Sequence, residues 1–302
     1  MSGDRVESQP YRFRFVPAPD DLKPYFNSLY TWESDEEKLV DHLPAYSGQL
    51  IVVVTGEGAM KFGPKRVSRA NNPFVLAPLL QAYQFQVRGP ARMLGVSLNF
   101  HGWAAMTGLP VDEYHDRVLS VKDAFSEAVH RRIATLTADL RSGSVEEDAA
   151  LDMLAEILRD CIAPLRDSHR QAIQETMGWL SGSMDPELSD LHRRLACSER
   201  QVQRLVTRFF GQSPVHLKRR YRAIRAATLL SMPELDPAIE AEIRNAFYDQ
   251  AHLIKEIRHF TGRTPRRLQP AAGSIVTETL GADGYGAVDL FGGNESEQLG
   301  KS

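Results

Sequence analysis

Two similar sequence units follow one another between residues 188 and 268. Each contains a short helical pattern, a turn, an N-capping residue and a longer helical pattern, first in LSDLHRRLACSERQVQRLVTRFFGQSP and then in AEIRNAFYDQAHLIKEIRHFTGRTP. Both units close on Gly-x-[Ser/Thr]-Pro, and Gly211 and Gly262 are 51 residues apart, as are Pro214 and Pro265. Because Gly and Pro end helices, this repeat predicts an all-α region made of two helix-turn-helix motifs.

The longer helix of the first unit is expected to begin after Ser198. The Ser198 hydroxyl can accept the backbone N–H three residues on while Gln201 reaches back, which forms a capping box. Apolar residues at helical spacing predict a buried stripe made of Val202, Leu205, Val206 and Phe209. Polar side chains are left on the outer side, namely Arg200, Gln203, Arg204 and Thr207.

In the second unit, Asp249 is the expected capping residue. The inward set is Phe247, Leu253, Ile257 and Phe260, and the less buried set is Gln250, His252, Ile254, Lys255 and Arg258. Between the units, PVHLKRRYRAIRAATLLSM predicts a basic helix with an apolar stripe of Leu217, Tyr221, Ile224, Ala227 and Leu230. At 1.5 Å per residue this helix is about 26 Å long and can hold two reading helices apart.

Residues 171–268 resemble the DNA-binding domain of the AraC/XylS family of bacterial transcription regulators. The resemblance is carried by SERQVQRL followed by GQSP, by the R-x-x-x-A-x-x-L-L run from Arg222 to Leu230, and by FYDQAHLIKEIRHFTGRTP. It implies two helix-turn-helix motifs joined by a long helix. The second helix of each motif is then expected to enter the major groove, in adjacent grooves about 34 Å apart.

The resemblance also implies which side chains read bases. They are Arg200, Gln203 and Arg204 in the first motif and Gln250, His252 and Lys255 in the second. Arg can bond both major-groove acceptors of guanine and Gln the edge of adenine, each worth about 1–3 kcal/mol of discrimination. The alternative is that these residues form only solvated polar faces.

Charge supports a nucleic-acid partner for this region. Residues 186–269 hold 16 Lys or Arg against 9 Asp or Glu, whereas the rest of the chain holds 20 against 30. A basic region beside an acidic remainder is typical of a DNA-binding domain attached to something else. We expect contacts to the DNA backbone from the helix caps Ser198 and Asp249 and from Arg193, Arg194, Lys218, Arg219, Arg220, Arg263, Arg266 and Arg267.

Two departures from the family pattern affect the motifs. Ala196 and Ala246 stand where the family usually has Gly in the turn, so a left-handed backbone there would cost about 1–2 kcal/mol. In addition, Glu242 occupies a position where the family normally buries a small Ala, with Ile239 and Ile243 in shifted phase. A buried unpaired Glu is costly, so we expect the helix before the second turn to be rotated, displaced or loosely packed.

The N-terminal part is expected to be β-rich, giving an α+β chain overall. GQLIVVVTGEGAMKFG predicts a strand, a Gly-containing turn and a short strand, and PFVLAPLL, YQFQVRG and ARMLGVSLNF follow as further strands. We predict a β-sandwich or barrel-like domain with flanking helices at residues 122–140 and 145–166. These two helices could form a dimer contact or could pack on the β-domain. HRQAIQETMGWLSG predicts another helix that opens the DNA-binding domain.

The expected division is a β-rich sensor or regulatory domain at 1–119, linking helices at 120–168, the double helix-turn-helix domain at 169–269 and a disordered tail at 270–302. An effector pocket is one hypothesis for the aromatic residues Trp32, Tyr46, Tyr83, Phe85, Phe100 and Trp103, although a packed core is the favoured reading. We expect no metal and no cofactor, since no His-x-His with a following Glu appears and His42, His101, His115 and His130 are scattered.

Together these features predict a sequence-specific transcription regulator that binds double-stranded DNA, expected to be an activator that acts with RNA polymerase. Its N-terminal domain would sense a small molecule, form a homodimer, or both. The alternatives are a non-catalytic interaction or non-specific DNA-binding protein whose second motif has decayed, and an enzyme such as an Ada-like repair protein. Catalysis is not expected, because Cys161 and Cys197 lack the setting of a nucleophile. Two Cys, no signal peptide and no membrane-spanning run indicate a soluble cytoplasmic protein.

Overall fold

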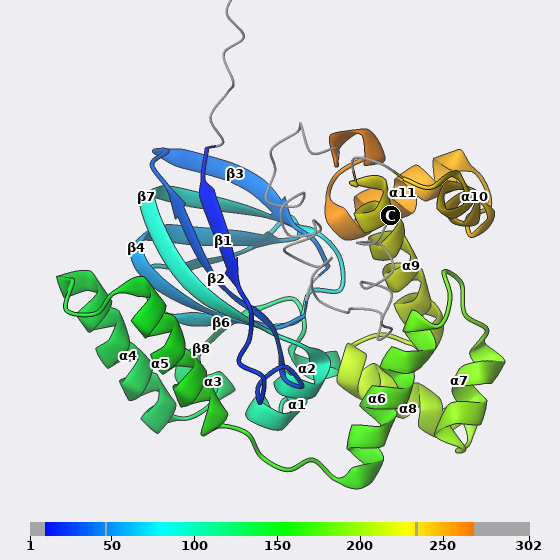
Figure 1. The fold of residues 1–302 in the computed structure, drawn as a ribbon, viewed down its shortest axis with the longest axis horizontal. Helices are drawn as coiled ribbons and strands as arrows, with labels where there is room; N and C mark the ends of the chain where they lie inside the picture. The colour runs from blue at the N-terminus through cyan, green and yellow to red at the C-terminus, as the bar shows by residue number, and fades with distance from the viewer. Residues whose placement is uncertain (1–9, 46, 233–234, 269–302) are drawn as a thin grey trace, which may run out of the picture.

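The computed structural model describes residues 10–45, 47–232 and 235–268 (Figure 1). The predicted tail at 270–302 and Tyr46 lie outside the described residues. A β-region comes first, followed by a helical region. Within the described part of the chain, no helix combines the length and the apolar character needed to cross a bilayer.

The predicted β-region is confirmed, and eight antiparallel strands form it in the described part of the chain. They are β1 (Arg12–Val16), β2 (Phe26–Ser34), β3 (Lys38–Leu43), β4 (Gln49–Phe62), β5 (Arg66–Ala70), β6 (Phe74–Leu76), β7 (Tyr83–Leu98) and β8 (Val118–Ser120). The order is β1-β2-β7-β4-β6-β8, with β3 also paired to β7 and β5 also paired to β4. Because β7 pairs with β2 through one half and with β3 through the other, the sheet curls into a barrel-like shape (Figure 1).

Two predicted strand breaks are wrong. The turn expected in GQLIVVVTGEGAMKFG is a bulge inside the continuous strand β4, with register shifts on either side of Thr55 and a positive φ of 84° at Gly56. A Cβ at Gly56 would lie 2.5 Å from the Cβ of Ala91, so only glycine fits this close approach. YQFQVRG and ARMLGVSLNF likewise form the single strand β7.

The two faces of the sheet bury different partners, because successive side chains of a strand point to opposite faces. On β4, Leu50, Val52 and Val54 face the helices α4 (Glu127–Ser142) and α5 (Glu147–Arg159), whereas Ile51 and Val53 face the inside of the barrel. The apolar faces of α4 and α5, for example Leu136 and Leu154, are therefore buried on the sheet. Of the two roles left open for these helices, packing on the β-domain is the one observed.

Two short helices between β7 and β8 were not predicted, namely α1 (Phe100–Thr107) and α2 (Val111–Tyr114). The helix predicted at residues 122–140 is divided into the short helix α3 (Val121–Ala124) and α4. The helix α1 is capped by Asn99, whose side chain accepts the N–H of Gly102, and it ends at Gly108 in the left-handed conformation. It matters for the site because its first residue, Phe100, contacts the helical region.

The helical region has the predicted double arrangement. It consists of α6 (Asp167–Ser181), α7 (Leu188–Leu195), α8 (Glu199–Phe210), α9 (Pro214–Leu230), α10 (Pro237–Asn245), α11 (Gln250–Thr261) and a 3-10 turn at Pro265–Arg267. Figure 1 shows α8 and α11 at opposite ends of α9. Of the stripe predicted on the long helix α9, Leu217, Tyr221, Ile224 and Ala227 are buried, and Leu230 is half-buried.

The two departures from the family pattern have different outcomes. Ala196 adopts the left-handed conformation with φ 48°, so the expected strain is present in the first turn. Ala246 has φ −75°, so the second turn avoids this strain. Glu242 is exposed, and Ile243 is the buried residue of α10. The helix has therefore turned its Glu to solvent, in line with the predicted rotation.

Candidate nucleic-acid interface and ligand cavity

The first reading helix, α8, presents a polar outer side. The capping box of Ser198 and Gln201 is present and fixes the start of the helix. Val202, Val206 and Phe209 are buried beneath it. The predicted base readers Arg200, Gln203 and Arg204 are all exposed, and neither arginine has an ion-pair partner among the described residues.

The second reading helix, α11, is capped by Asp249, whose carboxylate accepts the N–H of His252 at 2.7 Å. Gln250 and Lys255 are exposed. His252 is half-buried: its ring contacts Phe247 edge-on at 5.8 Å. The two exposed predicted readers are therefore Gln250 and Lys255, and His252 contributes mainly to the turn.

A buried ion pair that the sequence did not reveal ties α11 to α9. Arg219 donates to both carboxylate oxygens of Glu256, at 2.8 and 3.0 Å, and Glu256 is 2% exposed. Burial acts to raise the pKa of Glu256, but the Arg219 hydrogen bonds and charge outweigh it and hold that pKa below its usual value. Arg219 thus holds the second motif, whereas the sequence predicted a phosphate contact.

The other predicted phosphate contacts divide into exposed and engaged residues. Arg266 and Arg267 are exposed, whereas the exposed Arg193 and Arg194 form ion pairs with Asp190 and Glu175, respectively. Lys218 is 3.0 Å from Asp185, which also pairs with Arg222.

The predicted contact of Arg220 with the DNA backbone is wrong, because Arg220 is 2% exposed and lies over the ring of Phe100 at 5.6 Å. It packs between the helical region and the β-region and cannot reach a phosphate. Arg263 is also engaged: it forms an ion pair with Asp41 on β3.

The β-region contacts both motifs at matching positions. The helices α8 and α11 end at Gly211 and Gly262, each with φ 76°. A Cβ at Gly211 would lie 2.8 Å from Leu80, and one at Gly262 would lie 2.6 Å from the Cβ of His42. The β-region therefore packs directly against the C-terminal ends of both reading helices.

Hydrogen bonds and ring contacts complete this docking. The Ala45 N–H donates to the carbonyl of Phe260 at 2.7 Å, and the Ala82 N–H donates to the carbonyl of His259 at 3.0 Å. In the first motif, Phe210 packs on Phe100 with ring centroids 4.6 Å apart. Because the β-region occupies the C-terminal ends, the N-terminal turns of α8 and α11 stay open.

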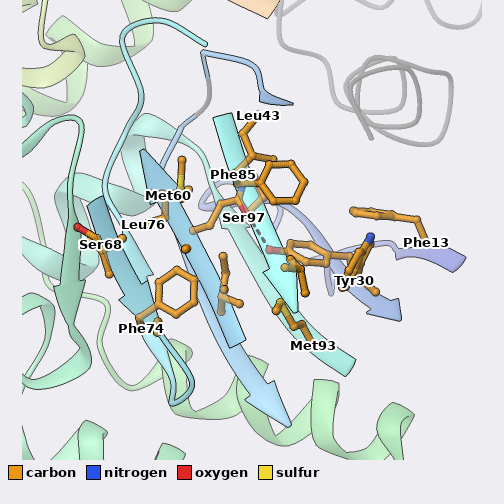
Figure 2. Close-up of a pocket in the computed structure, with 18 of the residues that line it drawn as sticks. Phe13, Tyr30, Leu43, Met60, Ser68, Phe74, Leu76, Phe85, Met93 and Ser97 are labelled. Carbon is orange, nitrogen blue, oxygen red and sulfur yellow. Dashed lines mark hydrogen bonds between the residues drawn. The ribbon is translucent and has the colours of Figure 1, made fainter. Parts of the chain in front are cut away.

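A cavity of about 110 Å³ lies inside the barrel (Figure 2). Its walls are mainly aromatic and aliphatic, and include Phe13, Tyr30, Trp32, Phe74 and Phe85. Among the described residues that line it, none is Asp, Glu, His, Lys or Arg. The polar lining comes from hydroxyl and amide groups, so the cavity suits an uncharged molecule.

Of the predicted pocket residues, the structure places Trp32 and Phe85 at this cavity. Tyr83 is buried beside it against Phe62. Phe100 and Trp103 were proposed for the pocket but do not line this cavity. Phe100 packs against Phe210, and the Trp103 indole donates to the carbonyl oxygen of Leu109 within the core.

Both cysteines are free and half-buried. Burial raises the pKa of Cys161 to about 11, which keeps its thiol protonated. Cys197 lies in the turn between α7 and α8, as the sequence indicated. In the described part of the chain, no group of three His, Cys, Asp or Glu side chains is placed to hold a metal ion.

Residues 191–270 match a family model described as a helix-turn-helix domain. A search of curated proteins finds no match. Among solved structures, the chain is similar to ToxT from Vibrio cholerae, at 8% identity and a TM-score of 0.45, over 88% of this chain and 99% of ToxT. It is also similar to the AraC-like transcriptional activator CuxR, at 13% identity and a TM-score of 0.31, over 72% of this chain and 87% of CuxR. The helix-turn-helix match covers both repeated units.

Proposed function

We propose that this chain, a DNA-binding transcription regulator whose residues 191–270 form an AraC-type helix-turn-helix domain, reads a specific DNA sequence with both α8 and α11. One observation carries the proposal: both helices are held at their C-terminal ends and open at their N-terminal turns. In helix-turn-helix proteins it is the N-terminal part of the second helix that contacts base edges. The exposed side chains there are Arg200, Gln203, Arg204, Gln250 and Lys255.

The chemistry of these side chains suits base reading. Arg200 and Arg204 can each grip a guanine, and Gln203 and Gln250 can each bond an adenine. The two arginines have no competing ion pair among the described residues, so no internal carboxylate has to be displaced when DNA binds. Exposed Arg266 and Arg267 beyond α11 are placed to contact phosphates.

The proposal is tested by selecting bound duplexes from a random DNA pool with the full-length chain at near-physiological salt, since affinity depends steeply on salt. Two enriched blocks about one helical turn apart are expected. On the selected site, Arg204→Ala should lose about 1–3 kcal/mol and relax one position, whereas Arg266→Ala should weaken all sequences alike. Equal, sequence-independent losses for both variants would contradict base reading.

A second candidate is that only the first motif reads bases. It is favoured by α10, where Ile243 is the buried residue and Glu242 is exposed, so the second motif is thinly packed. The same selection separates the two cases, because this candidate gives a single enriched block. The ion pair between Arg219 and Glu256 supports two working motifs, since it fixes α11 on α9.

We further propose that the β-region senses a small molecule in the barrel cavity and that β3 transmits its binding. Leu43 on β3 lines the cavity, while Asp41 and His42 on the same strand contact the end of α11. One strand therefore contacts both the cavity and the second motif. Isothermal titration of DNA with and without effector would show the coupling as a change in DNA affinity.

Activation, contact with RNA polymerase and a homodimer are retained as proposals from the family resemblance, together with the division at residues 119, 168 and 269. A promoter-reporter assay fixes the sign of regulation, and sedimentation fixes the oligomeric state. The faces of α4 and α5 buried on the sheet are not free for a dimer contact, so such a contact would use other surfaces.

A further inference from the structure

We infer that the barrel cavity binds a neutral, single-ring aromatic molecule with one hydrogen-bond acceptor, and that the side-chain amide of Gln49 bonds this acceptor. The inference rests on the proposed sensing function and names the class of its effector. Three features of the cavity carry it: its size and walls, its lack of charge, and one donor that is left without a partner.

The size and walls fit a single aromatic ring. The cavity holds about 110 Å³, somewhat less than the roughly 150 Å³ of an apolar protein cavity known to bind benzene. Figure 2 shows Tyr30, Phe74 and Phe85 around this space. Aromatic walls favour aromatic ligands, because offset and edge-to-face ring pairs add to the gain from burial.

The charge of the lining excludes an ionised ligand. The described lining residues include no Lys, Arg or His that could neutralise a carboxylate, and no Asp or Glu that could neutralise an amine. Burial raises the pKa of Tyr30 well above its usual value, so this hydroxyl stays neutral. A charge brought into such a site loses its hydration without compensation.

The side-chain amide of Gln49 in the lining is held in place, but its N–H groups have no hydrogen-bond partner among the described residues. The Tyr30 hydroxyl donates to Oε1 of Gln49 at 2.7 Å, which fixes the amide and leaves its Nε2 as a donor. Gln49 is 6% exposed, and its Nε2 has no hydrogen-bond partner among the described residues. By contrast, the Asn27 amide in the same cavity donates to Ser47, Ser97 and the Leu98 carbonyl.

A donor that faces the cavity without a protein partner can bond an acceptor on the ligand. The Trp32 indole N–H is also buried without a hydrogen-bond partner among the described residues. Both unmet groups are donors, which is why the ligand needs an acceptor. An uncharged carbonyl on a ring satisfies all three features.

The test is isothermal titration calorimetry on the full-length chain with three probes: acetophenone, ethylbenzene and benzoate. The first two share the ring and its two-carbon side chain, but only acetophenone has an acceptor, and benzoate adds a charge. A ligand of about nine heavy atoms binds with a Kd on the order of 0.1–1 mM. Acetophenone should bind roughly 3- to 10-fold tighter than ethylbenzene, the usual range for one hydrogen bond, and benzoate should give no measurable heat.

The variant Gln49→Leu should bring acetophenone to the affinity of ethylbenzene. Gln84→Leu is the matched control, because Gln84 is exposed on β7 outside the cavity, and it should leave both affinities unchanged. If Gln49→Leu does not fold, the three-probe series on the unaltered chain still decides. Equal binding of acetophenone and ethylbenzene, tighter binding of benzoate, or no heat from any probe would overturn the inference. DNA is absent from these titrations, so failure of DNA reading is detected separately by the duplex selection.

Discussion

Replacing Gly262 by Ala should loosen the docking of α11 on the β-region. Gly262 has φ 76°, a conformation that costs an L-residue about 1–2 kcal/mol. The added Cβ would also lie 2.6 Å from the Cβ of His42 and 2.7 Å from its Cγ. These atoms lie close to the β3 backbone and cannot rotate away, so the helix and strand must separate by roughly 1 Å to restore ordinary contact distances.

Gly143 provides a matched control, because it ends α4 with φ 74° and a Cβ there would have no atom within 4 Å. Both Ala variants carry the same backbone cost, and only Gly262→Ala adds the overlap. Forced overlap of this size costs about 1–3 kcal/mol. The difference between the two variants therefore isolates the docking contact.

Amide hydrogen exchange measures this difference directly. The N–H groups of Ala45 and Ala82 donate across the interface to the carbonyls of Phe260 and His259. In Gly262→Ala their exchange should speed up by roughly 5- to 150-fold, the equivalent of 1–3 kcal/mol in the opening equilibrium. In Gly143→Ala it should not change. Equal exchange of these two amides in both variants would refute the docked arrangement in solution.

Three further predictions follow from the same contacts. Arg219→Ala should cost about 2–4 kcal/mol in urea unfolding, at the lower end for a buried pair because the Arg219 side chain is 38% exposed. Since the pKa of Glu256 is lowered in the fold, the ion pair stabilises the fold above the unfolded Glu pKa of about 4.3, and this stabilisation is lost as pH falls through the pKa of Glu256 in the folded protein. An unchanged free energy of unfolding in Arg219→Ala would refute the pairing. Burial, with the nearby Arg263 charge, lowers the pKa of His42, so the docking of α11 on the β-region should weaken as pH falls below about 6.5. The amides that donate across this interface should then exchange faster relative to interior amides. Ala196→Gly should raise the unfolding free energy by up to about 1 kcal/mol by relieving the left-handed backbone at φ 48°; a loss would show that the turn is unstrained.

The helices of the double motif could be predicted because their signals are local. The capping box at Ser198, the cap at Asp249 and the left-handed Gly211 and Gly262 each involve residues within one turn of the helix they bound. The apolar stripe of α9 is likewise a property of one segment. Local signals of this kind hold when the rest of the fold agrees with them.

The errors fall where distant residues decide the outcome. The sequence pattern predicted a turn within GQLIVVVTGEGAMKFG and a break between YQFQVRG and ARMLGVSLNF, but long-range pairing of β4 with β7 makes each a continuous strand. Arg220 has the sequence setting of a surface cation, yet it is buried because Phe100 of an unpredicted helix lies beneath it. Glu256 is buried because Arg219, 37 residues away, supplies its partner. No periodicity within either segment encodes these pairs.

The candidate DNA contacts and the cavity depend on this long-range structure to different extents. Exposure of Arg200 and Arg204 follows from the helical period alone. The cavity could not be predicted, because its wall combines residues from strands β1 to β8, and two of the six aromatic residues proposed for it belong to the core around α1.

Ligand binding in the cavity can change DNA binding only under an energetic condition, and β3 can meet this condition. A ligand changes the docking equilibrium only by the difference between its affinities for the docked and undocked forms. Leu43 lines the cavity at the end of β3, and Asp41 and His42 precede it on that strand at the contact with Arg263 and Gly262. A shift of β3 on undocking would move Leu43 in the cavity wall, so a ligand packed on Leu43 binds the two forms unequally. A tenfold difference in affinity is worth about 1.4 kcal/mol, comparable to the 1–3 kcal/mol by which Gly262→Ala is expected to disturb the same contact.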